Sequence, residues 1–150
     1  MNNELIIREY NFEDKPKLLE ILKLNVPKYF AESEIVDLDN YLDHEIEKYY
    51  VLIFENQIIG AGGINFEENY TIGKISWDFI HPNFQGIGAG TKLLKHRLDI
   101  LKSMHEIKTI SVRTSQLVYK FYQKNGFVLK EVKNDYWAPG FDLYNMIYEQ

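Results

Sequence analysis

The residues whose types and spacing point most clearly to a binding function lie between His81 and Gly90, in the stretch HPNFQGIGAG. Three glycines in this stretch directly precede an amphipathic helical pattern. Glycine lets another molecule approach the backbone closely, and the first N–H groups of a helix have no partner within the helix. The positive end of the helix dipole favours an anion at the same place. The sequence therefore predicts a phosphate-binding loop formed by Gln85, Gly86, Ile87, Gly88, Ala89, Gly90 and Thr91.

Two other glycine-rich phosphate loops do not fit these residues. A Walker A loop needs Gly-Lys followed by Ser or Thr, but Gly90 is followed by Thr91 and then Lys92. A dinucleotide-binding fingerprint that begins at Gly86 would need a third glycine where Thr91 stands, and too little chain would remain for a doubly wound sheet. A plain turn between a strand and a helix stays open as the alternative for the loop alone.

Composition limits the classes to which the protein can belong. The 150 residues, 45% of them hydrophobic, suit one compact domain over residues 1–150. The chain has no cysteine, which excludes thiolate catalysis, thiolate zinc sites and disulfides. Its four histidines are not paired at the spacing of metal ligands, so we expect no metal site. The net charge of −5 argues against binding to nucleic acids.

Targeting signals are not evident in the sequence. Residues 1–4 lack the basic and apolar regions of a signal peptide, and no apolar run approaches the roughly 18 residues of a membrane helix. We therefore expect a cytoplasmic protein that does not bind membranes.

Hydrophobic periodicity predicts the order of the strands and helices. Strands are expected at residues 5–10, 49–54, 57–65, 71–80, 107–112, 127–132 and 141–148. Helices are expected after residues 12–14 as far as Pro27, at 32–48, at 88–102, and in a short segment that Ser115 caps and Asn125-Gly126 ends. Gly60, Gly62 and Gly63 indicate a bulge or a close packing contact in their strand. This order predicts an α+β fold, a mixed sheet with helices on both faces.

Side-chain positions follow from the same patterns. In the helix at 88–102 the buried residues are expected to be Leu94, Leu98 and Leu101, whereas Lys92, Lys95 and Arg97 are expected to face water. An aromatic loop is expected to join the last two strands and to contain Tyr136, Trp137 and Phe141.

The spacing Gln85-x-x-Gly88-x-Gly90 resembles the pyrophosphate-binding signature Q/R-x-x-G-x-G/A of the GNAT superfamily of acetyl-CoA-dependent N-acetyltransferases. A second stretch, SQLVYKFYQKNGF from Ser115 to Phe127, resembles the family's other signature, a helix that ends in aromatic-Tyr-x-K-x-G-F. The resemblance extends over residues 49–127 and implies a central mixed, mostly antiparallel sheet. The first 48 residues match only in the order of their elements, and in the family this region shapes the acceptor site.

The resemblance implies acetyl-CoA as the cofactor and assigns roles to further residues. Tyr122 corresponds to the phenol that protonates the departing CoA thiolate. The resemblance also places Phe79, Ile80, Ser115 and Tyr119 along the cofactor. Backbone N–H groups near Phe79 and Ile80 would stabilise the oxyanion. The family often carries Asn where Ser115 stands. Some members have a catalytic Glu where this chain has Ile110, so a base must come from elsewhere.

Acetyl transfer to an amine also needs a route for protons. An alkylammonium has a pKa of about 10.4, so freeing its lone pair at pH 7 costs about 4.6 kcal/mol. Asp78, on the strand that leads into the glycine loop, is the carboxylate best placed by sequence to act as the base, directly or through water. An ordinary structural acid is the alternative for Asp78, and a core tyrosine is the alternative for Tyr122.

Together the residues and the resemblance predict an N-acetyltransferase, monomeric or homodimeric, that acts on a primary amine of a small molecule or a protein. An acyl-CoA-binding regulatory module without transfer activity and a structural domain without a cofactor are the alternatives. Acidic residues in the acceptor region favour a cationic amine, although a solvated helix face explains such a run equally well; they are Glu32, Glu34, Asp37, Asp39, Asp43, Glu45 and Glu47.

Overall fold

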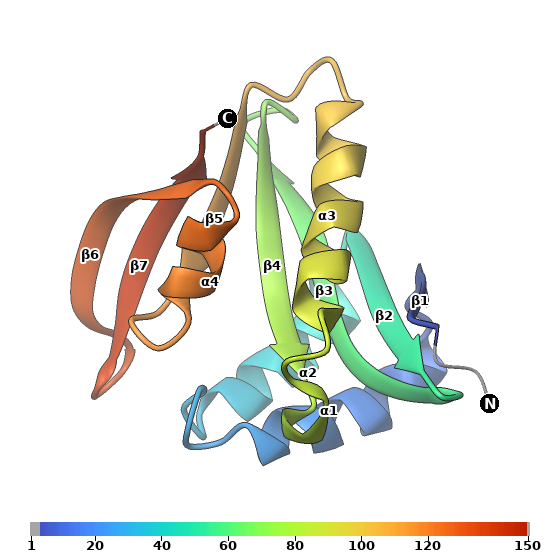
Figure 1. Ribbon diagram of the computed structural model, residues 1–150. Coiled ribbons are helices and arrows are strands. Elements are labelled where there is room, and N and C mark those ends of the chain that lie inside the picture. The colour runs from blue at the N-terminus through green and yellow to red at the C-terminus, as the bar shows by residue number, and fades with distance from the viewer. Residues whose placement is uncertain (1–3, 150) are drawn as a thin grey trace.

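A seven-stranded sheet in the order β1-β2-β3-β4-β5-β7-β6 forms the centre of the protein (Figure 1). The computed structural model describes residues 4–149, so Met1–Asn3 of the N-terminal stretch interpreted above lie outside it. β4 and β5 run parallel, and the other neighbouring strands run antiparallel. The expected mixed, mostly antiparallel sheet is confirmed. Its strands are β1 (Ile6–Glu9), β2 (Lys48–Phe54), β3 (Gln57–Glu67), β4 (Ile72–Ile80), β5 (Thr109–Thr114), β6 (Phe127–Ala138) and β7 (Phe141–Tyr148).

Helices cover both faces of the sheet, as the element order predicts (Figure 1). On one face lie α1 (Lys15–Leu24) and α2 (Glu34–His44), and on the other lie α3 (Ala89–Lys102) and α4 (Tyr119–Lys124). Leu18 and Leu38 of the first pair pack with Val51 of β2. Leu94 of α3 packs with Ile75 of β4 in a separate core on the opposite face. Two short 3₁₀ turns complete the chain, Phe12–Asp14 and Pro82–Phe84.

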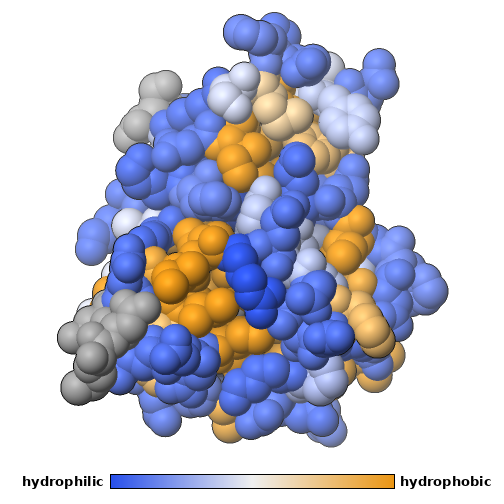
Figure 2. Space-filling model, turned by 90° about the vertical axis from the view of Figure 1, so that its right-hand side faces the viewer, coloured by the Kyte–Doolittle hydropathy of each residue, from blue (hydrophilic) through white to orange (hydrophobic). Residues whose placement is uncertain are grey.

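The side of the protein beside β1 and β2 is mostly hydrophilic, with apolar residues gathered in several areas, the largest of them just below the middle of the view (Figure 2). A small third core lies within this part of the fold and joins Leu52, Ile59 and Ala89. No helix within residues 4–149 is both long enough and apolar enough to cross a membrane.

Several expected boundaries differ from the structure, and the largest differences are at the end of α2 and in β6. α2 ends at His44 rather than Lys48, and Ile46 beyond it is 36% exposed. The predicted aromatic loop is instead the end of β6, because Tyr136 and Trp137 precede Ala138, which still pairs with Phe141. Aromatic residues favour strands, and a two-residue turn at 139–140 suffices to reverse the chain.

One extra residue interrupts the pairing of β4 with β3. Ala61 pairs with Phe79 and Gly63 with Ser76, which leaves Trp77 and Asp78 opposite Gly62. Trp77 has a φ of +49°, a left-handed conformation that is uncommon for a bulky residue. The glycines of β3 indicated a bulge or a close packing contact in their own strand, and both are present. Ile59 is an extra residue between the pairs Gly60–Leu52 and Ile58–Ile53, and a Cβ on Gly60, Gly62 or Gly63 would lie 2.7 Å or less from another atom. The extra residue of β4 is a separate bulge in the partner strand.

The bulge in β4 changes which face of the sheet the side chains after it occupy. Strict alternation would place Ile75, Trp77 and Phe79 on one face. Instead Ile75 packs in the core beneath α3, whereas Trp77 and Phe79 pack with the core beneath α1 and α2. Asp78, between these last two, therefore points to the α3 face.

We expect the bulge to depend on a hydrogen bond from the buried hydroxyl of Tyr49, which donates to the carbonyl of Trp77 at 2.9 Å. Tyr49→Phe removes this donor and should lower the free energy of unfolding by about 1–3 kcal/mol, measured by urea denaturation. Tyr70→Phe is the control, because Tyr70 is 51% exposed, and it should change little. A Tyr49→Phe protein as stable as the wild type would show that the bulge does not need this bond.

Candidate active site

The glycine loop places free backbone N–H groups at the start of α3. Gly86 and Gly88 have φ values of +85° and +83°, and Gly88 is the residue that caps the helix. The first helical hydrogen bond runs from Lys92 N–H to Gly88 O at 3.0 Å, so the N–H groups of residues 89–91 precede the helical ladder. A Cβ built on Gly86 or Gly88 would meet nothing within 4 Å. The loop is therefore open to an anion such as a phosphate, and its geometry fits the predicted role.

Strands β4 and β5 separate just before this loop. Their pairing ends at Ile75 opposite Val112, although β4 continues to Ile80. Beyond Ile75 the side of β4 that faces β5 therefore has no strand partner among residues 4–149.

The backbone of Ile80 points to this open side. Ile80 lies opposite Gly60, and the His81 N–H donates to Ile59 O at 2.6 Å. This pattern marks a non-hydrogen-bonded pair, whose N–H and C=O groups point away from the partner strand. Phe79 is in the neighbouring hydrogen-bonded pair, so its N–H faces β3. Of the two predicted oxyanion donors, Ile80 is the one directed into the gap.

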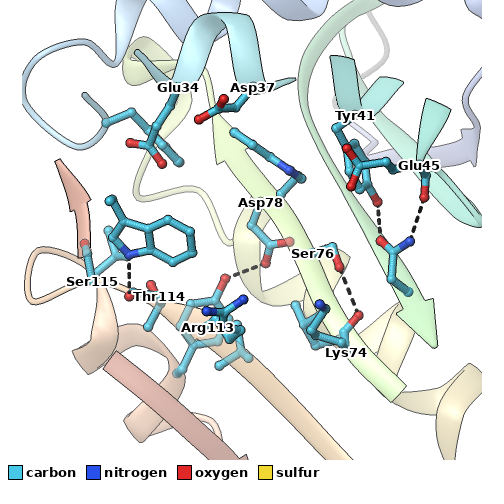
Figure 3. Close-up of a pocket in the computed structure, with 18 of the residues that line it drawn as sticks. Glu34, Asp37, Tyr41, Glu45, Lys74, Ser76, Asp78, Arg113, Thr114 and Ser115 are labelled. Carbon is cyan, nitrogen blue, oxygen red and sulfur yellow. Dashed lines mark hydrogen bonds between the residues drawn. The ribbon is translucent and has the colours of Figure 1, made fainter. Parts of the chain in front are cut away.

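A cleft of about 540 Å³ opens where the two strands diverge. Residues from both faces of the sheet line it: α2 contributes Glu34 and Asp37, β4 contributes Trp77 and Asp78, and α4 contributes Tyr122 (Figure 3). The cleft therefore reaches from the α2 side of the sheet to the tyrosine on the α4 side. It brings together the two side chains predicted to be catalytic.

Asp78 links Tyr122 to a buried arginine. The Tyr122 hydroxyl donates to Asp78 Oδ2 at 2.6 Å, and Arg97 Nη2 donates to the same oxygen at 2.8 Å. Arg97 Nη1 donates to Asp78 Oδ1, which completes a bidentate ion pair. The predicted base is thus already engaged by three donors.

The prediction that Arg97 faces water is wrong, because its side chain is 0% exposed. Its position in the sequence carried a signal for burial. Arg97 lies three residues after Leu94 and four before Leu101, on the apolar stripe of α3. A cation on an apolar stripe needs a buried anion, and the bulge supplies Asp78 on the facing strand.

Burial and charge keep this group of residues in defined protonation states. Burial raises the pKa of the Tyr122 hydroxyl well above its usual value, and the neighbouring Asp78 charge raises it further. Burial acts to lower the pKa of Arg97, but the charge and hydrogen bonds of Asp78 raise it above its ordinary value. At neutral pH Tyr122 therefore holds its proton and Arg97 its charge.

The remaining predicted cofactor residues take different positions. Gln85, Ile87 and Thr91 are exposed around the loop. Ser115 lines the cleft but does not cap α4, because its Oγ accepts from Leu117 N–H at 3.2 Å in a separate turn before the helix. Tyr119 lies at the start of α4, with its ring 4.7 Å from that of Tyr144 on β7.

The acidic residues predicted near the acceptor fall into two groups, those that line the cleft and those that do not. Glu34, Asp37, Glu45 and Glu47 line the cleft, but Glu32, Asp39 and Asp43 do not. Asp39 and Asp43 instead form ion pairs with Lys15 of α1. Residues three or four apart share one side of a helix, so the positions of Asp39 and Asp43 follow from their offset to Glu34 and Asp37.

The cleft carries an excess of negative charge. Asp78 is neutralised by Arg97, Glu67 pairs with Lys74 at 3.2 Å, and Arg113 on the cleft wall adds one positive charge. The carboxylates of Glu34, Asp37, Glu45 and Glu47 have no ion pair within the described part of the chain. Burial raises the pKa of Glu34, whose Oε2 accepts from Ala31 N–H at 2.8 Å.

Solved structures of acetyltransferases share this fold. An acetyltransferase of the GNAT family from Desulfovibrio desulfuricans is 16% identical, with a TM-score of 0.80 over 97% of this chain and 99% of that one. Naa50 from Arabidopsis thaliana, solved with the bisubstrate analogue CoA-Ac-MVNAL, is 17% identical, with a TM-score of 0.74 over 97% and 99% of the two chains. At these identities the similarity shows the fold alone.

Sequence comparison supplies the family. The uncharacterized N-acetyltransferase ycf52 of Porphyra purpurea is 41% identical over 66 residues, which are 42% of this chain and 37% of that protein. The match thus spans less than half the length of this relative. The profile of the acetyltransferase (GNAT) domain matches residues 25–150, and the chain belongs to the GNAT acetyltransferase family.

Proposed function

We propose that the protein transfers the acetyl group of acetyl-CoA to a primary amine. The observation that carries this proposal is the position of the protonated Tyr122 hydroxyl, which lies in the cleft between β4 and β5 and is bonded to Asp78 of β4, the strand that leads into the phosphate-binding loop. An acyl-CoA-binding module would need the loop but no proton donor in the cleft.

Each part of the site has a role in this proposal. Acetyl-CoA, when bound, supplies the activated acyl group. The N–H groups at the start of α3 bind its phosphates, and the Ile80 N–H offers a donor for the oxyanion in the gap. Tyr122 holds a proton at its hydroxyl for the sulfur that leaves.

The contacts of Asp78 favour a different role for it than that of the predicted base. Releasing the proton of an alkylammonium to water at pH 7 costs about 4.6 kcal/mol, which a catalysed reaction can supply. Both oxygens of Asp78 already accept hydrogen bonds, and two of these bonds meet at Oδ2. We therefore assign the first deprotonation of the amine to water in the cleft, and we assign Asp78 to holding Tyr122.

The negative cleft favours a cationic acceptor, such as an amine with a second positive charge. Glu34 and Asp37 lie together on the first turn of α2, with their side chains toward the cleft (Figure 3). Trp77, Tyr41 and Phe30 place aromatic rings beside them, with the Phe30 and Trp77 rings stacked 6.3 Å apart. Carboxylates together with aromatic rings suit an alkylammonium.

Gly88→Glu should abolish cofactor binding, because its charge and bulk would occupy the space above the α3 N–H groups. Acetyl-CoA at about 100 times its Kd should raise the melting temperature of the wild type by roughly 5–10 °C. Gly140→Glu is the matched control, because Gly140 has nearly the same φ of +84° and equally open surroundings. The control should keep the full thermal shift. A folded Gly88→Glu protein with unchanged affinity would contradict the assignment of the loop.

Tyr122→Phe should lower turnover by about 10²-fold and leave the affinity for acetyl-CoA nearly unchanged, since it removes the proton donor and keeps the ring. Steady-state kinetics with release of free CoA thiol measure both quantities. Tyr50→Phe removes another buried tyrosine hydroxyl of the same core without touching the cleft, and its turnover should match the wild type. Wild-type turnover in Tyr122→Phe would make Tyr122 a packing residue.

A panel of amines tests both the transfer and the class of acceptor. Diamines and polyamines should give a higher kcat/KM than neutral or acidic amines, and the advantage should shrink as salt screens charges beyond about 10 Å at 0.1 M. Asp37→Asn should lower kcat/KM for these cations roughly fivefold, equivalent to about 1 kcal/mol.

Asp39→Asn is the matched control for the acceptor panel. It makes the same change of charge on the same helix but pairs with Lys15 outside the cleft, so it should have little effect. If none of the amines tested causes release of thiol, the transferase proposal fails and the two alternatives without transfer activity remain. A best acceptor that is anionic would contradict the cationic class.

A further inference from the structure

We propose that Arg97 is a positioning residue for acetyl transfer: it fixes Asp78 so that the carboxylate holds the Tyr122 hydroxyl in place at the cleft. This inference rests on the proposed function, in which Tyr122 donates a proton. Arg97 itself does not line the cleft, and its hydrogen bonds reach Tyr122 only through Asp78.

Each of the three guanidinium nitrogens of Arg97 donates at least one hydrogen bond. Its Nε donates to Leu93 O at 3.2 Å within α3, and its Nη1 donates to Gly63 O of β3 at 3.1 Å. Both terminal nitrogens then donate to Asp78. Because these anchors belong to α3, β3 and β4, the guanidinium can shift only if a helix and two strands shift with it. Asp78 therefore receives one fixed orientation.

The space for this arrangement comes from Gly62. A Cβ built on Gly62 would lie 2.6 Å from Asp78 Oδ1 and 2.8 Å from Arg97 Nη1, closer than side chains can approach. The residue opposite the bulge is thus a glycine for a steric reason. The ion pair fills the volume that any other side chain would occupy.

The position of the pair relative to the cleft distinguishes it from a purely structural ion pair. Arg97 is 0% exposed, whereas the Asp78 side chain is 18% exposed and lines the cleft beside Tyr122. The hydroxyl of Tyr122 has one hydrogen, which is bonded to Asp78 before the transfer, so the O–H bond must turn from Asp78 to the sulfur when it donates. Arg97 thereby sets the position of an oxygen that meets the substrates.

Charge gives Arg97 a second effect on the same hydroxyl. Burial and the Asp78 charge raise the pKa of Tyr122, and the Arg97 charge opposes them. When Tyr122 passes its proton to sulfur, its oxygen would become an anion beside the Asp78 carboxylate. The guanidinium offsets the repulsion between them until the oxygen regains a proton, which the acylated nitrogen loses and water in the cleft carries to it.

The decisive variant is the double substitution Arg97→Met/Asp78→Asn, which removes both charges together. A protein often keeps its stability when both partners of a buried ion pair are replaced by neutral groups of similar size, whereas it loses stability when one partner is removed. We expect a folded protein with a melting temperature near that of the wild type and a kcat about 10²-fold lower, with KM for acetyl-CoA within twofold. Lys95→Met, an exposed change on the same helix, is the control and should keep wild-type kinetics.

Arg97→Lys provides a second test that keeps the charge but loses the two-pronged contact with Asp78. The kcat of Arg97→Lys should fall at least about tenfold, with KM little changed. This test remains valid if the double variant folds poorly. A wild-type kcat in either variant would make the Arg97–Asp78 pair structural and overturn the inference.

A titration without substrates tests the network independently of catalysis. Asp78→Asn removes the charge that raises the pKa of Tyr122 and leaves Arg97 beside it, so the phenol should ionise at a lower pH than in the wild type. Ultraviolet absorbance measures this, with each protein compared with its Tyr122→Phe counterpart. An unchanged midpoint would contradict the coupling. If the wild type transfers acetyl to no amine, the proposed function fails, while the titration still reports on the network.

Discussion

The extra residue in β4 opposite Gly62 is the constraint on which the site depends. It turns Asp78 toward α3 and directs Trp77 into the cleft beside Phe30 and Tyr41. Without it, period-two alternation would bury Trp77 beneath α3 and turn Asp78 toward α2. The left-handed backbone at Trp77 is an unfavourable conformation for a bulky residue, of order 1–3 kcal/mol, and the buried Tyr49 hydroxyl holds the carbonyl of that residue.

A buried arginine in the centre of the fold also carries an energetic cost. Desolvation of its charge is offset by Asp78 and by the two carbonyls that accept from it, and loss of one partner of such a pair typically costs 3–5 kcal/mol. An apolar pair could fill the same volume without that cost. The ion pair instead gives a fixed position to the Tyr122 hydroxyl, which an apolar pair could not do. Its presence is therefore better explained by the site than by stability.

The sequence predicted the features that depend on neighbouring residues and missed those that depend on distant ones. The loop of Gln85 to Thr91 needs only glycine spacing and a helix start, so the order of its residues was sufficient. The bulge has no local signal, because Ile75, Trp77 and Phe79 alternate as in a regular strand. Arg97 was placed in water from its polarity, although its spacing from Leu94 and Leu101 put it on the buried stripe. Asp39 and Asp43 were grouped with the cleft by composition, but the helix period places them beside Lys15.

The two faces of the sheet present opposite electrostatic environments to the two proposed substrates. The α3 N-terminus offers N–H groups and a positive dipole end to the anionic cofactor, whereas α2 presents carboxylates on the other face. In the proposed function, a cationic amine would be drawn to one entrance and a polyphosphate to the other. The faces connect where β4 and β5 diverge, and Asp78 and Tyr122 stand at that connection. Arg97 neutralises Asp78, so the carboxylate beside Tyr122 is a paired one. In the proposed function, the leaving thiolate would therefore be protonated away from the negative charges of the α2 side.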